Sequence, residues 1–125
     1  MPANGLSIIK KMMDNDFSTY DVRVIEGGNS ADGTAKVVYE IHTDDMCIAF
    51  YYYDMLATSI AIIDKNTKKK DNVLFKFYTL NHQTYKEVEA FLHGCRDIIH
   101  ENTYEGMDKK KLVKALQKFK VSFFK

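Results

Sequence analysis

The chain has 125 residues, of which 46% are hydrophobic and 28% charged, with a formal net charge of +1. This length and composition are typical of one globular domain over residues 1–125, and they exclude collagen-like and disordered chains. No apolar run is long enough to span a bilayer and no signal-peptide pattern opens the chain, so we expect an intracellular, cytoplasmic protein without a membrane partner.

The first half of the chain predicts a short helix and three strands. Apolar residues recur every three or four positions over Leu6–Asp16, which indicates a helix. Alternating apolar residues then predict strands over Tyr20–Ile25, Ala35–Thr43 and Met46–Tyr53. The segment EGGNSADGT contains turn-forming residues between the first two strands, and Asp44-Asp45 predicts a tight turn before the third.

The second half predicts two more strands and two helices. The strands cover Thr58–Ile63 and Asn72–Leu80, and a long amphipathic helix follows over Gln83–Glu101. Thr84 and Glu87 have the spacing of a capping box, with Asn81 as an alternative cap. Asp108 can cap a further helix, and the apolar tail VSFFK packs back on the core or against another subunit.

These elements predict the α+β class. Short connections favour antiparallel neighbours, so we expect an antiparallel sheet of about five strands. The long helix Gln83–Glu101 packs on one face of this sheet, accompanied by a second C-terminal helix and a short N-terminal helix.

The residues that could bind a metal do not predict a metal site. Glu89, His93, Asp97 and His100 lie along one side of the long helix, but charged residues opposite an apolar stripe are typical of a solvated face. Cys47 and Cys95 form no CxxC motif and are interpreted as reduced, buried thiols. His42, at the end of a strand, adds nothing specific. We therefore predict no metal and no cofactor.

Catalysis has no signature in this sequence. There is no GxSxG, HExxH or paired Cys–His pattern. The glycine-rich segment EGGNSADG joins two strands and does not lead into a helix, so it is interpreted as a hairpin loop and not as a phosphate cradle. We predict a protein that is not an enzyme.

The run Phe50-Tyr51-Tyr52-Tyr53 raises the main functional question, because neighbours in a strand point to opposite faces. Phe50 and Tyr52 share the more apolar face, which we expect the long helix to cover. That set is Val22, Val24, Val37, Tyr39, Ile41, Ile48, Phe50, Tyr52, Ile60, Ile62, Val73, Phe75 and Phe77. The complementary set is Arg23, Lys36, Glu40, Cys47, Ala49, Tyr51, Tyr53, Ala61, Lys76 and Tyr78.

The second set combines aromatic rings with cations, a mixture that suits the bases and phosphates of single strands. We predict that Tyr51, Tyr53 and Tyr78 stack on bases. Phosphates would be contacted by Arg23, Lys36, Lys76 and the loop lysines Lys65, Lys68, Lys69 and Lys70. The alternative is a small protein-interaction module, an inhibitor or assembly adaptor, that uses the same aromatic face or the apolar tail.

The charges are divided unevenly along the chain. Residues 1–60 carry four basic and nine acidic side chains, whereas residues 61–125 carry fourteen and eight, so the two halves have charges of −5 and +6. Such asymmetry allows one side of the protein to bind a polyanion, and it also favours self-association. We expect the lysines of Lys109–Lys118 to extend the basic path, and the protein to form a homo-oligomer.

The segment NVLFKFYTLNHQTYKEVEAFLHGCRDII, residues 72–99, contains a final strand, Leu80-Asn81 and an amphipathic helix. This arrangement resembles the PC4/Whirly type of single-stranded nucleic-acid-binding domain. The resemblance implies a curved antiparallel sheet that meets single strands, and assembly into dimers or tetramers. By position it implicates Lys76 and Tyr78 on the last strand, and Tyr51 and Tyr53 on an inner one.

Overall fold

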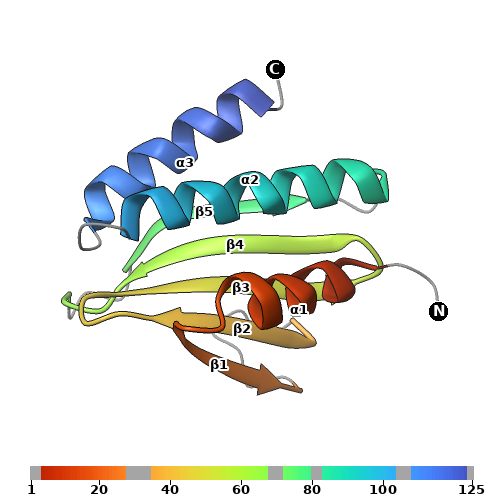
Figure 1. Ribbon diagram of the computed structural model, residues 1–125, viewed down its shortest axis with the longest axis horizontal. Coiled ribbons are helices and arrows are strands. Elements are labelled where there is room, and N and C mark those ends of the chain that lie inside the picture. The colour runs from red at the N-terminus through yellow and green to blue at the C-terminus, as the bar shows by residue number, and fades with distance from the viewer. Residues whose placement is uncertain (1–3, 28–34, 68–71, 80–82, 104–107, 124–125) are drawn as a thin grey trace.

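The structure, a computed structural model, describes residues 4–27, 35–67, 72–79, 83–103 and 108–123. It has the predicted α+β architecture, an antiparallel five-stranded sheet with three helices (Figure 1). The elements in chain order are α1 (Gly5–Asp16), β1 (Asp21–Glu26), β2 (Val37–His42), β3 (Met46–Asp54), β4 (Ala57–Asp64), β5 (Val73–Thr79), α2 (Tyr85–Thr103) and α3 (Lys109–Phe123).

The sheet is a meander, because each strand pairs with the strand that precedes it in the chain and the spatial order is β1-β2-β3-β4-β5. The turn predicted at Asp44-Asp45 is confirmed, and the backbone N–H of Thr43 donates to the carbonyl of Met46 across it (3.0 Å). This turn sets the register of β2 and β3, in which Ile41 faces Ile48. The register in turn places the two sets of alternating residues on opposite faces of the sheet.

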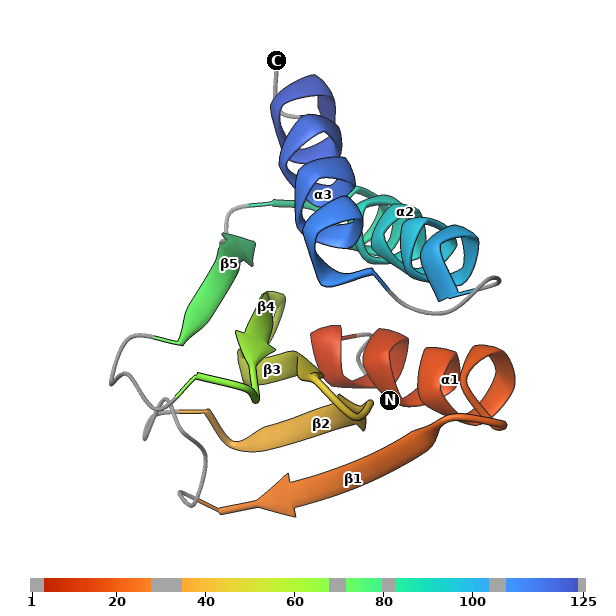
Figure 2. The same ribbon diagram turned by 90° about the vertical axis from the view of Figure 1, so that its left-hand side faces the viewer.

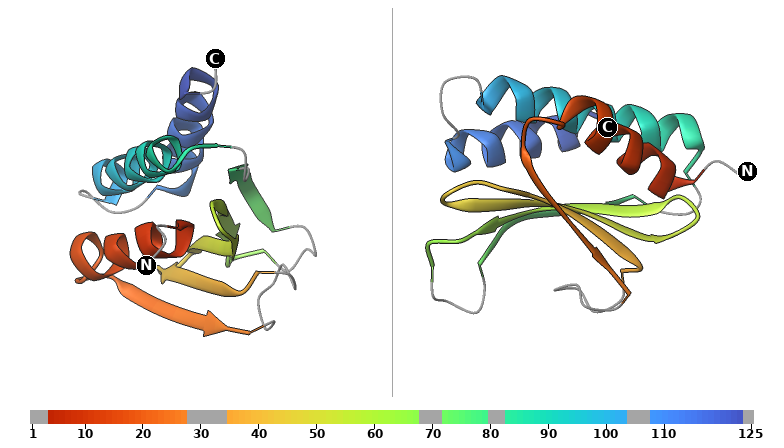
Figure 3. Two further views of the ribbon diagram at one scale, coloured as in Figure 1. Left: turned by 90° about the vertical axis from the view of Figure 1, so that its right-hand side faces the viewer. Right: turned by 60° about the horizontal axis from the view of Figure 1, so that its bottom comes forward.

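The three helices all lie on one side of the sheet (Figures 2 and 3). The N-terminal helix α1 packs over β2, β3 and β4, while α2 lies between α1 and α3, and α3 contacts β5. The short helix thus lies over the centre of the sheet, on the face that the long helix was expected to cover, and the long helix packs beside it. Within the described ranges, no helix combines the length and the apolar character needed to cross a bilayer.

The main core lies between the sheet and the helices. Phe50 from β3, Phe91 from α2 and Phe17 after α1 are fully buried there. The predicted apolar set forms the sheet side of this core, with Ile41, Ile48, Phe50, Ile60 and Ile62 all inaccessible to solvent. Val24 is exposed on the edge strand β1. Val73 is also exposed, because the register of β4 and β5 shifts between Ile62 and Ile63, so that Val73 pairs with Ile63, which packs on the face opposite the helices.

The predicted caps of the last two helices are present. The N–H of Glu87 donates to the Thr84 hydroxyl (3.2 Å), and the N–H of Thr84 donates to the Glu87 carboxylate (3.1 Å). Thr84 is therefore a cap of α2, while the alternative, Asn81, lies outside the described residues. Asp108 caps α3 by accepting hydrogen bonds from the N–H groups of Lys110 and Lys111. These interactions satisfy donors that a helix N-terminus leaves without partners.

Helices α2 and α3 approach closely because Gly94 has no side chain. A β-carbon at this position would overlap the ring of Phe119 from α3. Phe119 stacks on Phe91 with ring centres 5.5 Å apart, and Phe123 meets the same ring edge-on at 5.5 Å. The end of the chain up to Phe123 therefore packs back on the core, one of the two arrangements predicted for the tail.

Candidate nucleic-acid interface

The face of the sheet opposite the helices carries its own small cluster of buried residues. Small side chains dominate it, with half-buried Ile25, Tyr53 and Ile63 packed around the edge. The buried members are Ala35, Val38, Cys47, Ala49, Tyr51 and Ala61. This face carries the complementary set of residues that the alternation predicted. None of the described helices lies over it (Figure 3).

Three tyrosines from β3 and β5 gather on this face. Tyr51 and Tyr53 stack with ring centres 6.4 Å apart and planes inclined by 16°, and the ring of Tyr78 lies 5.9 Å from that of Tyr53. Ser59 on β4 pairs with Tyr51 on one side and with Tyr78 on the other. Its hydroxyl also lies 2.9 Å from that of Tyr53, within hydrogen-bonding distance. A small residue on β4 thus leaves room for the large rings on either side.

Lys76 joins the three rings into a tyrosine–lysine cluster, which consists of Tyr51, Tyr53, Lys76 and Tyr78. The Lys76 ammonium nitrogen lies 5.0 Å from the centre of the Tyr78 ring and 5.4 Å from that of Tyr51, both within the range of cation–π attraction. Lys76 faces Ala61 across the β4–β5 pair, and a side chain this small lets the lysine stem lie flat along the sheet.

The rings of the cluster differ in accessibility. Tyr78 is 47% exposed, whereas Tyr51 is only 3% exposed under its neighbours. Tyr53 is half-buried between them. The ring of Tyr51 is therefore the floor of the cluster and is not presented to a ligand in this structure. The surface that can meet a base consists of Tyr78, the accessible part of Tyr53, and Lys76.

The predicted phosphate-contacting residues on β1 and just before β2 are paired with carboxylates. Arg23 binds Asp21 at 3.0 Å, and this interaction holds the pKa of Asp21 below its ordinary value. Lys36 lies 3.1 Å from Asp54, at the end of the sheet where Tyr53 also lies. Arg23 is four strands from Lys76, about 19 Å at the usual strand spacing. Lys36 thus lies near the tyrosines, and Arg23 does not.

The predicted lysine loop lies at the other end of the sheet. Lys65 donates to the carbonyl of Thr43 (2.8 Å), next to the turn that precedes β3, whereas Tyr53 is near the far end of that strand. Lys68, Lys69 and Lys70 lie outside the described residues. The described part of the loop therefore does not adjoin the tyrosine–lysine cluster.

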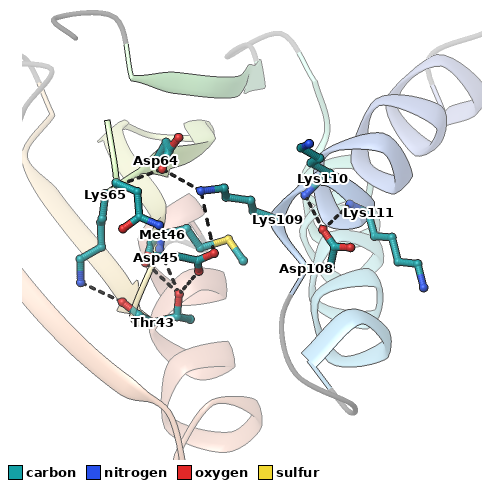
Figure 4. Close-up of polar contacts among 10 residues, drawn as sticks. Thr43, Asp45, Met46, Asp64, Lys65, Asp108, Lys109, Lys110 and Lys111 are labelled. Carbon is teal, nitrogen blue, oxygen red and sulfur yellow. Dashed lines mark hydrogen bonds and ion pairs between the residues drawn. The ribbon is translucent and has the colours of Figure 1, made fainter. Parts of the chain in front are cut away.

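The lysines of α3 lie on the helical side of the sheet, so they do not extend the tyrosine face. Lys109 is bound to Asp64 at 3.0 Å and lies 3.9 Å from Asp45, which ties the start of α3 to the end of β4 and to the turn before β3 (Figure 4). Hydrogen bonds from the backbone of Asn66 and from Lys109 lower the pKa of Asp64. The expected continuous basic path is thus replaced by an anchor at Lys109 and exposed lysines further along α3.

Of the residues of α2 considered as metal ligands, His100 contacts α1, and Asp97 pairs with an arginine that also contacts α1. His100 donates through Nε2 to the backbone carbonyl of Asp16 (2.8 Å), and Arg96 binds the Asp16 carboxylate at 3.2 Å. Asp97 in turn pairs with Arg96 at 3.0 Å. Among the described residues, Glu89, His93, Asp97 and His100 do not converge as a set of ligands.

A different polar trio was missed by the sequence reasoning. Glu40, His42 and Cys47 converge on the face opposite the helices, with His42 Nε2 3.0 Å from Glu40 Oε1 and 3.9 Å from Cys47 Sγ. Burial, followed by the nearby Glu40 charge, raises the pKa of Cys47 to about 12, so the thiol keeps its proton at neutral pH.

Cys95 is also a buried thiol, and its pKa is raised by burial alone. Both cysteines are free, as predicted.

No family model matches the chain, and no curated protein or solved structure matches it either. The resemblance of residues 72–99 to PC4/Whirly domains therefore stays a prediction.

Proposed function

We propose that this protein binds single-stranded nucleic acid, without catalysis, through the sheet face that carries the tyrosine–lysine cluster. The observation that carries the proposal is the pairing of an accessible ring with a cation: Tyr78 is half exposed and Lys76 lies 5.0 Å from its centre. An aromatic ring stacks on any unpaired base, and an adjacent ammonium group can contact the phosphate of the same nucleotide.

The described surface favours a short contact. Tyr78 and the accessible edge of Tyr53 provide places for one or two bases, and Lys36 lies at the same end of the sheet as Tyr53. Because Lys36 is paired with Asp54, a phosphate would have to displace this carboxylate. Both partners of the ion pair are exposed, so its free energy is small and the exchange is feasible. We expect modest affinity that depends on salt.

The experiment is fluorescence anisotropy with labelled single-stranded and double-stranded oligonucleotides at low and moderate salt. We expect preference for single strands, a loss of affinity with rising salt, and a roughly 5- to 150-fold weakening in Tyr78→Ala, the effect of one lost stacking interaction. Lys76→Met should reduce the slope of log affinity against log salt concentration by about one, the effect of one lost phosphate contact.

Two variants on α3 provide the matched control. Lys114 and Lys118 are exposed lysines on the helical side, so Lys114→Ala and Lys118→Ala should leave binding unchanged. If these two weaken binding as much as Lys76→Met, the oligonucleotide is held by general positive charge. If the wild type does not bind at low salt, the proposal is wrong. Light scattering on the same samples tests the predicted homo-oligomer.

A protein-binding role is the second candidate, and a groove beside β5 favours it. The groove has a volume of about 360 Å³ and is lined by exposed Leu74 together with Val113, Gln117 and three lysines of α3. Apolar residues framed by cations suit an acidic, amphipathic partner segment. Binding there would survive Tyr78→Ala and would be lost in Leu74→Asp, which separates the two candidate functions.

A further inference from the structure

We propose that Glu40, His42 and Cys47 form a site for a thiophilic divalent cation, with zinc as the best match. The three side chains carry one carboxylate, one imidazole and one thiol, each of which is a common zinc ligand. Their ligand atoms all lie within 4.8 Å of one another. The site is separate from the tyrosine–lysine cluster and does not depend on nucleic-acid binding.

The distances fit tetrahedral coordination after small side-chain movements. With zinc bonds of about 2.3 Å to sulfur and 2.0–2.1 Å to nitrogen or oxygen, neighbouring ligand atoms lie about 3.3–3.6 Å apart. The observed separations from His42 Nε2 are 3.0 Å to Glu40 Oε1 and 3.9 Å to Cys47 Sγ. The first separation must grow and the second shrink by a few tenths of an ångström, while the Glu40–Cys47 separation, which is at most 4.8 Å, must shrink by up to about 1.2 Å. Side-chain rotations can provide these movements.

The sheet makes this arrangement rigid. Glu40 and His42 are two residues apart on β2 and therefore point to the same face, while Cys47 is the direct partner of His42 on β3. All three positions belong to a paired part of the sheet, next to the tight turn. A site built on strands holds its ligands more precisely than one built on a loop.

The surroundings restrict the kind of cation. Cys47 is 4% exposed, and the side chains of His42 and Glu40 are 13% and 19% exposed, so the trio is largely shielded from solvent and has apolar neighbours around Cys47. A thiolate and an imidazole select zinc and related soft metals over magnesium or calcium. Three protein ligands leave a fourth position for water or for an atom of an incoming ligand.

Charged side chains next to the trio must rearrange when the cation binds. Lys65 Nζ lies 3.3 Å from His42 Nδ1, and Arg23 and Asp21 on β1 face Glu40 and His42 in register. Arg23 and Asp21 neutralise each other at 3.0 Å. Lys65 is exposed, so it can turn toward solvent when the imidazole transfers its proton to Nδ1 and binds the metal through Nε2. The Cys47 thiol releases its proton to solvent in the same step.

The test is a titration of the tag-free, chelator-treated protein with Co²⁺ and then with Zn²⁺. We expect one Co²⁺ per chain, a thiolate-to-cobalt charge-transfer band with intense tetrahedral visible bands, and displacement of Co²⁺ by Zn²⁺. Cys47→Ala should abolish the charge-transfer band, and Cys95→Ala, which removes the other buried thiol, should retain it. Circular dichroism establishes that each variant is folded.

Two further variants keep the test decisive if Cys47→Ala does not fold. Glu40→Gln should weaken Zn²⁺ binding at least tenfold, because a charged ligand is lost from a partly exposed position. Lys65→Met should strengthen Zn²⁺ binding several-fold, because it removes a cation next to the imidazole. Absence of the charge-transfer band in the wild type, or its loss in Cys95→Ala alone, would overturn the proposal.

Discussion

The ring of Phe119 on α3 occupies the space that a side chain at Gly94 on α2 would need. Overpacking a well-filled contact costs about 1–3 kcal/mol. Replacing glycine by alanine inside a helix returns up to about 1 kcal/mol. We therefore expect Gly94→Ala to lower the free energy of unfolding by about 1 kcal/mol, measured by urea denaturation.

The Phe119→Leu background provides the control for this prediction. A smaller side chain at position 119 leaves room for the new methyl group, so Gly94→Ala should be neutral or stabilising there. If Gly94→Ala already stabilises the wild type, the close contact between α2 and α3 is not as tight as described.

Tyr51 and Tyr78 belong to one cluster but should respond differently to truncation. Tyr51 is almost fully buried, so Tyr51→Ala should lower the free energy of unfolding by about 3–5 kcal/mol, as for other large aromatic residues. Tyr78→Ala removes a half-exposed ring and should cost less than about 1 kcal/mol. Urea denaturation of both variants tests this difference, and equal losses would contradict the assignment of Tyr51 as the floor of the cluster.

A pair of buried hydroxyl groups connects β4 to β5. Thr58 and Thr79 lie with their oxygens 2.6 Å apart, and the Thr79 oxygen also accepts a hydrogen bond from the N–H of Thr58 (3.1 Å). Thr79→Val removes these interactions and leaves buried polar groups without a partner, so we expect a loss of about 1–3 kcal/mol. Thr79→Ser keeps the hydroxyl, so its midpoint temperature of thermal unfolding should be closer to that of the wild type.

The ion pair at the start of α3 predicts a dependence of stability on pH. The folded pKa of Asp64 lies below its ordinary value of 3.8, so its ionised form stabilises the fold above that pH. The contribution is lost as the pH falls through the lower, folded pKa. Asp64→Asn should therefore lower the free energy of unfolding at neutral pH. As the pH falls below about 4, the variant and the wild type should become similarly stable, because Asp64 then becomes protonated in the wild type. Asp44→Asn, at an exposed position of the neighbouring turn, serves as the control in denaturation at several pH values.

The sequence predicted the sheet well because the decisive signals are local. Alternation placed Tyr51 and Tyr53 on one face, and the Asp44-Asp45 turn implied the register of β2 and β3. That same register places His42 opposite Cys47. The polar trio could therefore have been predicted by counting outward from the turn, although the sequence reasoning did not take this step.

The remaining features depend on contacts between distant parts of the chain. Tyr51 is buried partly because Lys76, two strands away, lies over its ring, and no local pattern contains this information. Lys109 belongs to a run of three lysines that is typical of a solvated helix, and only the docking of α3 brings it to Asp64. The position of α1 over β2, β3 and β4 was not predicted, because the apolar spacing of a short helix does not indicate which strands the helix covers.

The position of α1 has a consequence for synthesis of the protein. The Asp16 carboxylate at its end binds Arg96, a residue 80 positions later in the chain, and the main core contains Ile9 and Met12 from α1. At about 5–20 residues per second, a ribosome needs roughly 4–16 s to make the intervening chain. During that interval the first helix has no α2 to cover its apolar side, so the nascent chain presents a segment that chaperones can bind until the second helix emerges.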